Sequence, residues 1–127
     1  MTQQIELTLP WPPTVNTYYR TVNGAMLISE RGRKYAKAVA DQVLIQRGAK
    51  QLAGRLNVHI VAMPPDRRKR DLDNLFKGVL DSLTKAGVWL DDSQIDALAI
   101  ERGSIGGMLK VRVVEVCLLY TSPSPRD

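Results

Sequence analysis

Carboxylates and cations lie side by side in one stretch of the chain, residues 63–77. The four consecutive cations Arg67 to Arg70 directly precede the aspartates Asp71 and Asp73. Cations attract phosphate and carboxylates repel it, so on a solvated surface the two groups would largely cancel. They work together when a divalent metal ion lies between the carboxylates and a phosphodiester. The segment therefore suggests a metal-dependent nuclease.

The spacing of the aspartates constrains where the following helix begins. Magnesium prefers oxygen ligands and keeps several waters, so two or three carboxylates suffice. A continuous helix would point Asp71 and Asp73 about 200° apart, whereas an extended segment points residues i and i+2 the same way. We therefore expect the helix to begin near Asp73, with Asp71 still in the incoming loop. Asp92 can join them only if the turn after the helix folds back to its N-terminus, and Asp91 is a further candidate ligand.

Lys77 lies four residues after Asp73, on the same face of the expected helix. It could position a water molecule, stabilise a developing negative charge, or simply pair with Asp73. Each aspartate also has a purely structural interpretation. Asp71 and Asp73 would then be helix caps, and the later pair Asp91 and Asp92 would be turn residues.

Two segments are candidates for binding nucleic acid. The basic run Arg67 to Arg70 could neutralise backbone phosphates, although a charge run is often only a solvated loop. In residues 16–20 the rings of Tyr18 and Tyr19 could stack on exposed bases. The alternative for these rings is packing on the core, and the sequence does not decide between the two.

The hydrophobic pattern predicts alternating strands and helices. Strands are expected at 4–9, 56–63, 95–100 and 109–116, with a short apolar piece at 26–28, and helices at 30–46 and 72–86. Ser29 is the expected N-cap of the first helix and Gly87 the stop of the second. The turn signal Gly106-Gly107 predicts that the last two strands form an antiparallel hairpin.

Composition favours one globular domain in the cytoplasm. The chain has 127 residues and a net charge of +5, which favours an anionic partner. Its single cysteine, Cys117, excludes an intrachain disulfide, and no apolar stretch approaches the roughly 20 residues that span a bilayer. Residues 117–127 contain Ser-Pro-Ser-Pro and are expected to be a disordered tail outside the domain at 1–116.

Several motifs together resemble one known family, the RusA-type Holliday junction resolvases, small endodeoxyribonucleases often carried by phages and prophages. The matching segments are Leu7 to Pro13, the Asn-x-Tyr-Tyr-Arg loop at 16–20, Met63 to Leu75, and Asp81 to Gln94. The resemblance covers nearly everything before the tail. It implies a homodimer with an α/β (α+β) two-layer sandwich fold, in which a mixed sheet of four to five strands packs against two main helices.

The resemblance also assigns roles to individual residues. It implies that Asp71, Asp73 and Asp92, with Asp91 as a possible addition, bind Mg²⁺, that Mn²⁺ can substitute, and that Lys77 is catalytic. It implies DNA binding by Thr14, Val15, Asn16, Thr17, Arg67, Arg68, Lys69, Arg70 and Asn74. Two of these positions depart from the family pattern: Val15 is apolar, and Lys69 lacks the bidentate fork of arginine.

The expected activity is Mg²⁺-dependent resolution of four-way DNA junctions by two symmetric nicks that leave 5′ phosphates. The expected partners are branched DNA and a second copy of the chain, with no membrane and no small-molecule cofactor. Two alternatives remain open, a less selective branched-DNA or flap nuclease and a junction-binding protein that does not cut. The carboxylates favour cleavage, because a protein that only binds phosphate gains nothing from acids among its contacts.

Overall fold

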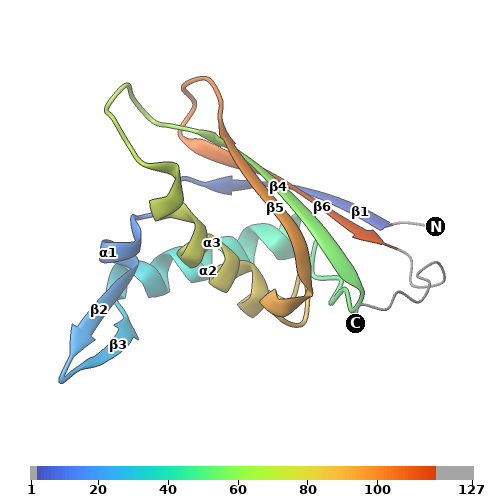
Figure 1. The fold of residues 1–127 in the computed structure, drawn as a ribbon, viewed down its shortest axis with the longest axis horizontal. Helices are drawn as coiled ribbons and strands as arrows, with labels where there is room; N and C mark the ends of the chain where they lie inside the picture. Colours follow the sequence, from blue (N-terminus) through green and yellow to red (C-terminus); the bar gives the residue numbers. More distant parts are fainter. Residues whose placement is uncertain (1–2, 117–127) are drawn as a thin grey trace.

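Four strands of alternating apolar and polar residues form one mixed sheet in the computed structural model, which describes residues 3–116 (Figure 1). The strands are β1 (Gln3–Pro10), β4 (Arg55–Met63), β5 (Ile95–Arg102) and β6 (Met108–Val116). Their order across the sheet is β1-β6-β4-β5. β6 pairs antiparallel with both neighbours, whereas β4 and β5 run parallel. A parallel pair needs a crossover connection, which is why a helix lies between these two strands in the chain.

One face of the sheet carries the core, and no helix of residues 3–116 covers the other face. In β4 the buried residues Leu56, Val58 and Ile60 alternate with more exposed ones. The two main helices, α2 (Glu30–Ile45) and α3 (Phe76–Lys85), both lie against the buried face and contact each other (Figure 1). The expected two-layer α/β architecture with a mixed sheet and two main helices is confirmed. No helix within residues 3–116 is long and apolar enough to cross a membrane.

The helix predicted at 30–46 is confirmed as α2. The Ser29 hydroxyl accepts a hydrogen bond from the backbone N–H of Gly32 at 3.0 Å, which satisfies one free donor at the helix start. Tyr35, Val39 and Val43 recur every four residues and are buried against the sheet and α3.

The helix predicted at 72–86 is split in the structure. Its first turn is a 3₁₀ helix, η1 (Leu72–Leu75), and the α-helix begins at Phe76. No side chain caps either start, and the N–H of Asn74 bonds to the carbonyl of Asp71 at 3.2 Å, a three-residue reach that winds the chain tightly. Gly87, with φ +86°, follows the end of α3 as predicted.

The predicted hairpin between the last two strands is wrong, because β4 lies between β5 and β6. The turn at Gly106-Gly107 does reverse the chain, but the loop passes over the end of β4. There the N–H groups of Gly103 and Gly106 bond to the carbonyls of Ala62 and Pro64, each at 2.8 Å. The more apolar strand β6 takes the interior position, and β5, which leaves most of its residues exposed, takes the edge.

A small hairpin projects from the helical layer (Figure 1). The one-turn helix α1 (Val15–Tyr18) leads into β2 (Tyr19–Val22), which pairs with β3 (Ala25–Ile28). Asn23 and Gly24 both have positive φ, as the tight turn of a two-residue hairpin requires. The loop expected at 16–20 is therefore ordered as part of a helical turn and a strand, and the apolar piece at 26–28 is confirmed as a strand. The predicted tail at 117–127 lies outside the described residues.

Candidate nuclease site around η1 and α3

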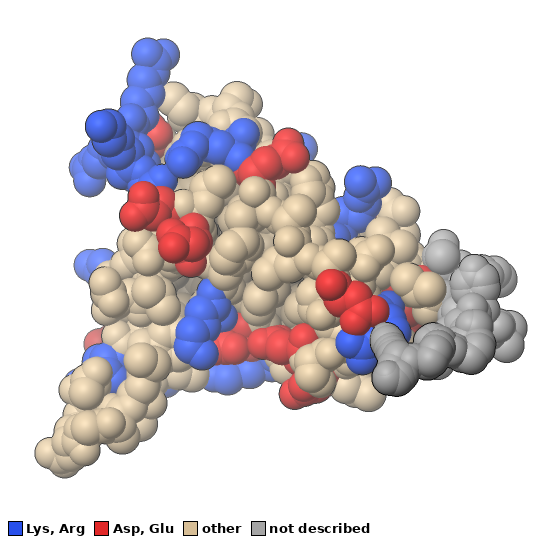
Figure 2. Space-filling model, viewed as in Figure 1, with Lys and Arg blue, Asp and Glu red and all other residues tan. Residues whose placement is uncertain are grey.

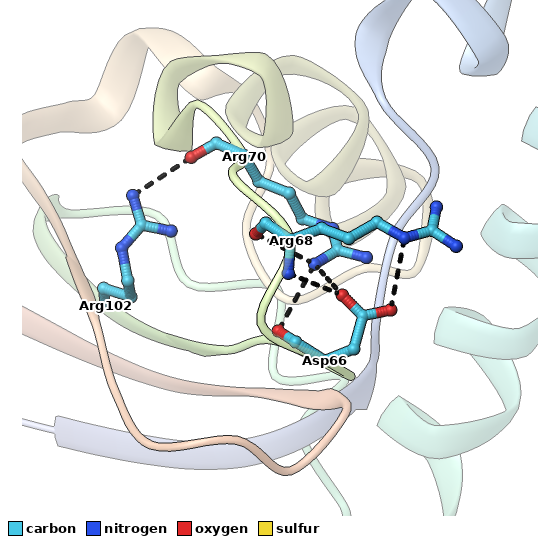
Figure 3. A network of polar contacts seen from close by, with 4 residues as sticks. All are labelled: Asp66, Arg68, Arg70 and Arg102. Carbon is cyan, nitrogen blue, oxygen red and sulfur yellow. Dashed lines mark hydrogen bonds and ion pairs between the residues drawn. The ribbon is translucent and has the colours of Figure 1, made fainter.

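Asp66 organises the basic loop that leaves β4 (Figure 3). Its Oδ1 accepts hydrogen bonds from the guanidinium of Arg70 at 2.7 Å and from the backbone N–H of Arg68 at 3.0 Å. The Arg68 Nε lies 3.8 Å from the other carboxylate oxygen. These hydrogen bonds, with that of Arg70 the largest contributor, lower the pKa of Asp66 to about 2. The loop is therefore folded around one carboxylate.

The four cations of this loop are not equivalent. Arg70 is only 20% exposed, and its guanidinium lies 5.7 Å from the centroid of the Trp11 ring. Arg67, Arg68 and Lys69 are exposed. Arg70 therefore anchors the loop, a role that was not predicted from the sequence, and the other three present exposed charge to an anion, although Arg68 also lies near Asp66.

Arg102 is a cation that the sequence analysis missed. It ends β5, and its guanidinium donates a hydrogen bond to the backbone carbonyl of Arg70 at 3.0 Å (Figure 3). With residues 67–71 it lines a shallow groove of about 420 Å³. The parallel register, in which Ala62 lies opposite Arg102, brings it there. The predicted hairpin paired β5 with β6, so it did not predict that Arg102 lies next to the basic loop after β4.

Asp71 and Asp73 take the positions that the sequence predicted. Asp71 precedes η1 in an extended conformation (φ −87°, ψ 127°), and Asp73 lies in the first turn of η1. Both are exposed, and neither carboxylate has a hydrogen bond or ion pair with any residue from 3 to 116. Figure 2 shows acidic side chains next to the basic cluster at this end of the molecule.

Asp92 lies at the opposite end of α3. Its Oδ1 accepts hydrogen bonds from the hydroxyl of Thr84, in the last turn of α3, and from the indole N–H of Trp89 at 3.2 Å. Trp89 is buried in the core, so the Asp92 carboxylate is held firmly on one oxygen. Asp91 caps the short 3₁₀ helix η2 (Asp92–Gln94), where its carboxylate accepts the Ser93 N–H. Hydrogen bonding from the Ser93 hydroxyl first, and from its backbone N–H second, lowers the pKa of Asp91.

The structure does not gather the three predicted metal ligands. Thr84, the partner of Asp92, comes eleven residues after Asp73, which at 1.5 Å per residue is about 16 Å along the helix. No three His, Cys, Asp or Glu side chains among residues 3–116 form a group that could hold a metal ion. The turn after α3 therefore stays at the helix C-terminus.

Lys77 pairs with Asp81 and not with Asp73. Its Nζ lies 3.8 Å from Asp81 Oδ2 and 5.1 Å from the centroid of the Tyr19 ring. The Tyr19 hydroxyl donates a hydrogen bond to the same carboxylate. Burial raises the pKa of the Asp81 carboxyl, and the charge of Asp92 adds to this rise while Lys85 opposes it. The sequence analysis missed Asp81, and the only local signal was its place four residues after Lys77.

Residues 14–17 lie close to the helical segment that carries Asp73, Lys77 and Asp81, because α1 contacts both η1 and α3. Thr14 and Asn16 are exposed, whereas Val15 and Thr17 are half-buried. Tyr18 is fully buried, and Tyr19 is held by Asp81. Of the two interpretations left open for these rings, packing against the fold is the one observed.

Comparisons with known proteins agree with these motifs. The family model for endodeoxyribonuclease RusA matches residues 10–114. The chain is 38% identical to the crossover junction endodeoxyribonuclease of Enterobacteria phage HK97 over 115 residues, which is 89% of this chain and 96% of the phage protein. It is 40% identical to the crossover junction endodeoxyribonuclease of Escherichia coli K12 and 41% identical to that of Enterobacteria phage 82, in each case over 87% of this chain and 93% of the relative.

The ordering of the basic loop by Asp66 can be tested by titration. Because the folded pKa lies below the unfolded value of about 3.9, this ordering is complete above pH 4 and is lost as the pH falls through about 2. In Arg70→Gln we expect the pKa of Asp66 to rise toward the unfolded value, while Arg31→Gln, on exposed α2 surface, leaves it unchanged. Carboxyl carbon NMR shifts measure both. An Asp66 that titrates near 3.9 in the unmodified protein contradicts the assignment.

Proposed function

This chain belongs to the RusA family of crossover junction endodeoxyribonucleases, and from that premise we propose how the surface around η1 and α3 cuts a four-way junction. The chain hydrolyses one phosphodiester in a junction strand and leaves a 5′ phosphate and a 3′ hydroxyl. A second copy cuts the opposed strand, so that two symmetric nicks resolve the junction.

One observation carries this proposal: Asp71 and Asp73 have no partner among the described residues although they follow four cations. Asp66 accepts a hydrogen bond from the Arg70 guanidinium and so pairs with that one cation of the run, while Arg67, Arg68 and Lys69 stay exposed. Two exposed, neighbouring carboxylates without a partner in residues 3–116 would repel phosphate and so weaken a protein that only binds DNA. They are suited to a divalent cation that also contacts the substrate.

The donor set fits Mg²⁺, with Mn²⁺ as a substitute. Within residues 3–116, Asp71 and Asp73 offer free carboxylate oxygens, and Asp92 has no hydrogen bond on Oδ2 while Oδ1 is held by Thr84 and Trp89. The family resemblance implies Asp92 as a third ligand, but α3 separates it from Asp73 by about 16 Å, so Asp71 and Asp73 are the two carboxylates that would hold the ion here, with water completing its coordination. A bound divalent ion would polarise the phosphate and make a coordinated water more acidic.

The remaining side chains bind and orient the DNA. Arg67, Arg68 and Lys69 are exposed beside the carboxylates and would hold phosphates, with Arg102 as a further cation in the same groove. Thr14 and Asn16 are exposed at the start of α1, which contacts η1. The family resemblance also implies DNA contacts for Val15, Thr17 and Asn74. The ammonium of Lys77 would stabilise negative charge that develops on the phosphate.

The ligand assignment is tested with Asp73→Asn, which keeps the size of the side chain and removes its charge. We expect this variant to bind a four-way junction as tightly as the unmodified protein or more tightly, because a repulsive charge is lost. We expect its nicking in Mg²⁺ to fall below detection. Gel-shift binding and single-turnover nicking on the same labelled junction measure the two effects. Nicking at the rate of the unmodified protein would contradict the assignment of Asp73 as a metal ligand.

The role of the basic loop is tested by the double variant Arg68→Ala/Lys69→Ala. Each phosphate contact contributes about 0.9 to the slope of log affinity against log salt concentration, so losing two contacts in each of two copies should flatten the slope by roughly 3.6. Lys34→Ala/Lys37→Ala removes the same charge from the α2 surface and serves as the matched control. Equal slopes for the two double variants would show that the basic loop does not contact DNA phosphates.

We assign the second copy to the open face of the sheet. This face carries acidic Glu6 and Glu101 together with basic Lys110 and Arg112, and a shallow groove of about 440 Å³ runs along it. A two-fold axis presents a surface to itself, so a face with both signs of charge can be self-complementary. No helix of the described chain covers it (Figure 1).

Sedimentation equilibrium tests this assembly. The unmodified protein should sediment at twice the mass of one chain, and Arg112→Glu should shift it toward the monomer because like charges then meet across the axis. Arg31→Glu, on exposed α2, makes the same change away from this face and should leave the dimer intact. A wild-type monomer that still makes paired nicks would contradict the assembly.

A further inference from the structure

Lys77 is restrained more tightly than an exposed lysine on a helix usually is. Its ammonium contacts the Asp81 carboxylate at 3.8 Å and lies over the face of the Tyr19 ring at 5.1 Å. An exposed ion pair four residues apart contributes little and would not by itself fix a flexible side chain. Here the side chain of Asp81 is only 31% exposed, and the ring adds a cation–π contact. Two partners therefore hold one ammonium.

Tyr19 is itself fixed by the packing of its neighbour. Tyr18 is fully buried against α3, where its hydroxyl hydrogen-bonds to that of Ser82 at 2.9 Å. Its ring lies so close to Gly78 that a Cβ added there would be 2.7 Å from a ring carbon. On the other side, the Ser29 hydroxyl donates to the Tyr18 carbonyl at 3.0 Å. Because Tyr18 is fixed in this way, the next residue, Tyr19, is held where its hydroxyl reaches Asp81.

The choice of partner matters because Lys77 has two carboxylates within reach. Asp73 lies four residues before it and Asp81 four residues after it. Asp73 lies in the 3₁₀ turn η1 and is not in α-helical register with Lys77, but the flexible four-carbon stem of Lys77 lets its ammonium turn toward either carboxylate. The structure pairs Lys77 with Asp81 and leaves Asp73 without a partner in the described chain.

We infer that Asp81, oriented by the Tyr19 hydroxyl, is a positioning residue that holds Lys77 away from Asp73 and so keeps Asp73 free for a divalent cation. The inference rests on the proposed function in that Asp73 is taken as a metal ligand. Without Asp81 the ammonium of Lys77 turns to Asp73, competes with the cation there, and leaves its place beside the substrate phosphate.

Metal binding without DNA gives the first test. Mn²⁺ titration followed by electron paramagnetic resonance should show weaker affinity in Asp81→Asn by about twofold, the size of one exposed ion pair. The double variant Asp81→Asn/Lys77→Met should recover the affinity, since no ammonium remains to compete. Asp41→Asn removes the partner of Lys37 in a comparable pair on α2 and should bind Mn²⁺ like the unmodified protein.

Nicking gives the second test. In saturating Mg²⁺, Asp81→Asn should lower the single-turnover rate by roughly 10- to 100-fold, as misplacement of a catalytic group does, with junction affinity unchanged. Tyr19→Phe keeps the ring and loses one hydrogen bond, so its rate should fall by roughly 2- to 10-fold. Asp81→Glu restores a carboxylate and should recover part of the rate. Melting temperatures measured alongside show whether any variant has simply lost its fold.

The outcomes separate this inference from the proposed function. Either an Mn²⁺ affinity or a nicking rate of Asp81→Asn equal to that of the unmodified protein overturns the inference. A rate loss in which junction affinity and melting temperature fall together also overturns it, because Asp81 is then only structural. If Asp73→Asn binds Mn²⁺ normally or Lys77→Ala nicks normally, it is the proposed function that fails. Loss in those two variants with normal behaviour of Asp81→Asn leaves the proposed function intact.

Discussion

Two parallel strands can be joined only by a chain that returns over the sheet, and here the return from β4 to β5 is made by η1 and α3. This crossover sets the place of every candidate residue. The start of the helical segment lies at the end of β4, where the basic loop leaves the sheet, and Arg102 at the end of β5 arrives beside the same loop. The helix then carries Lys77 and Asp81 along one face toward the turn that holds Asp92.

Charge is divided along this path between groups that build the protein and groups that remain available. Asp66 and Arg70 satisfy each other and shape the loop, and Asp81 engages Lys77. What remains unpaired in residues 3–116 is Asp71 and Asp73, next to exposed cations. A surface on which internal ion pairs leave carboxylates free beside cations is suited to a phosphodiester and a divalent ion together. Of the cations and carboxylates in residues 63–77, some therefore pair with each other within the fold, and the others remain available to a ligand.

The sequence predicted what depends on local pattern. Alternation located the strands, four-residue spacing located α2, and the i, i+2 geometry of Asp71 and Asp73 correctly required the helical segment to begin between them. It could not predict what depends on strand order. A Gly-Gly turn reports that the chain reverses, not which strand it then pairs with, so β5 was assigned to β6 and Arg102 was missed. The roles of Arg70 and Asp81 were missed for a related reason: their partners Trp11 and Tyr19 are more than fifty residues away in the chain.

Nick mapping on a mobile four-way junction tests the central claim most directly, namely that two copies of this acidic and basic surface cut opposed strands with a divalent ion. Each strand is end-labelled in turn and incubated with the protein beside a linear duplex of the same sequence, with and without Mg²⁺. The account predicts nicks at symmetric positions in two opposed strands of the junction, with 5′ phosphates, only when Mg²⁺ is present. Equal cutting of the linear duplex, nicks in a single strand, or cutting that persists in chelator would contradict it.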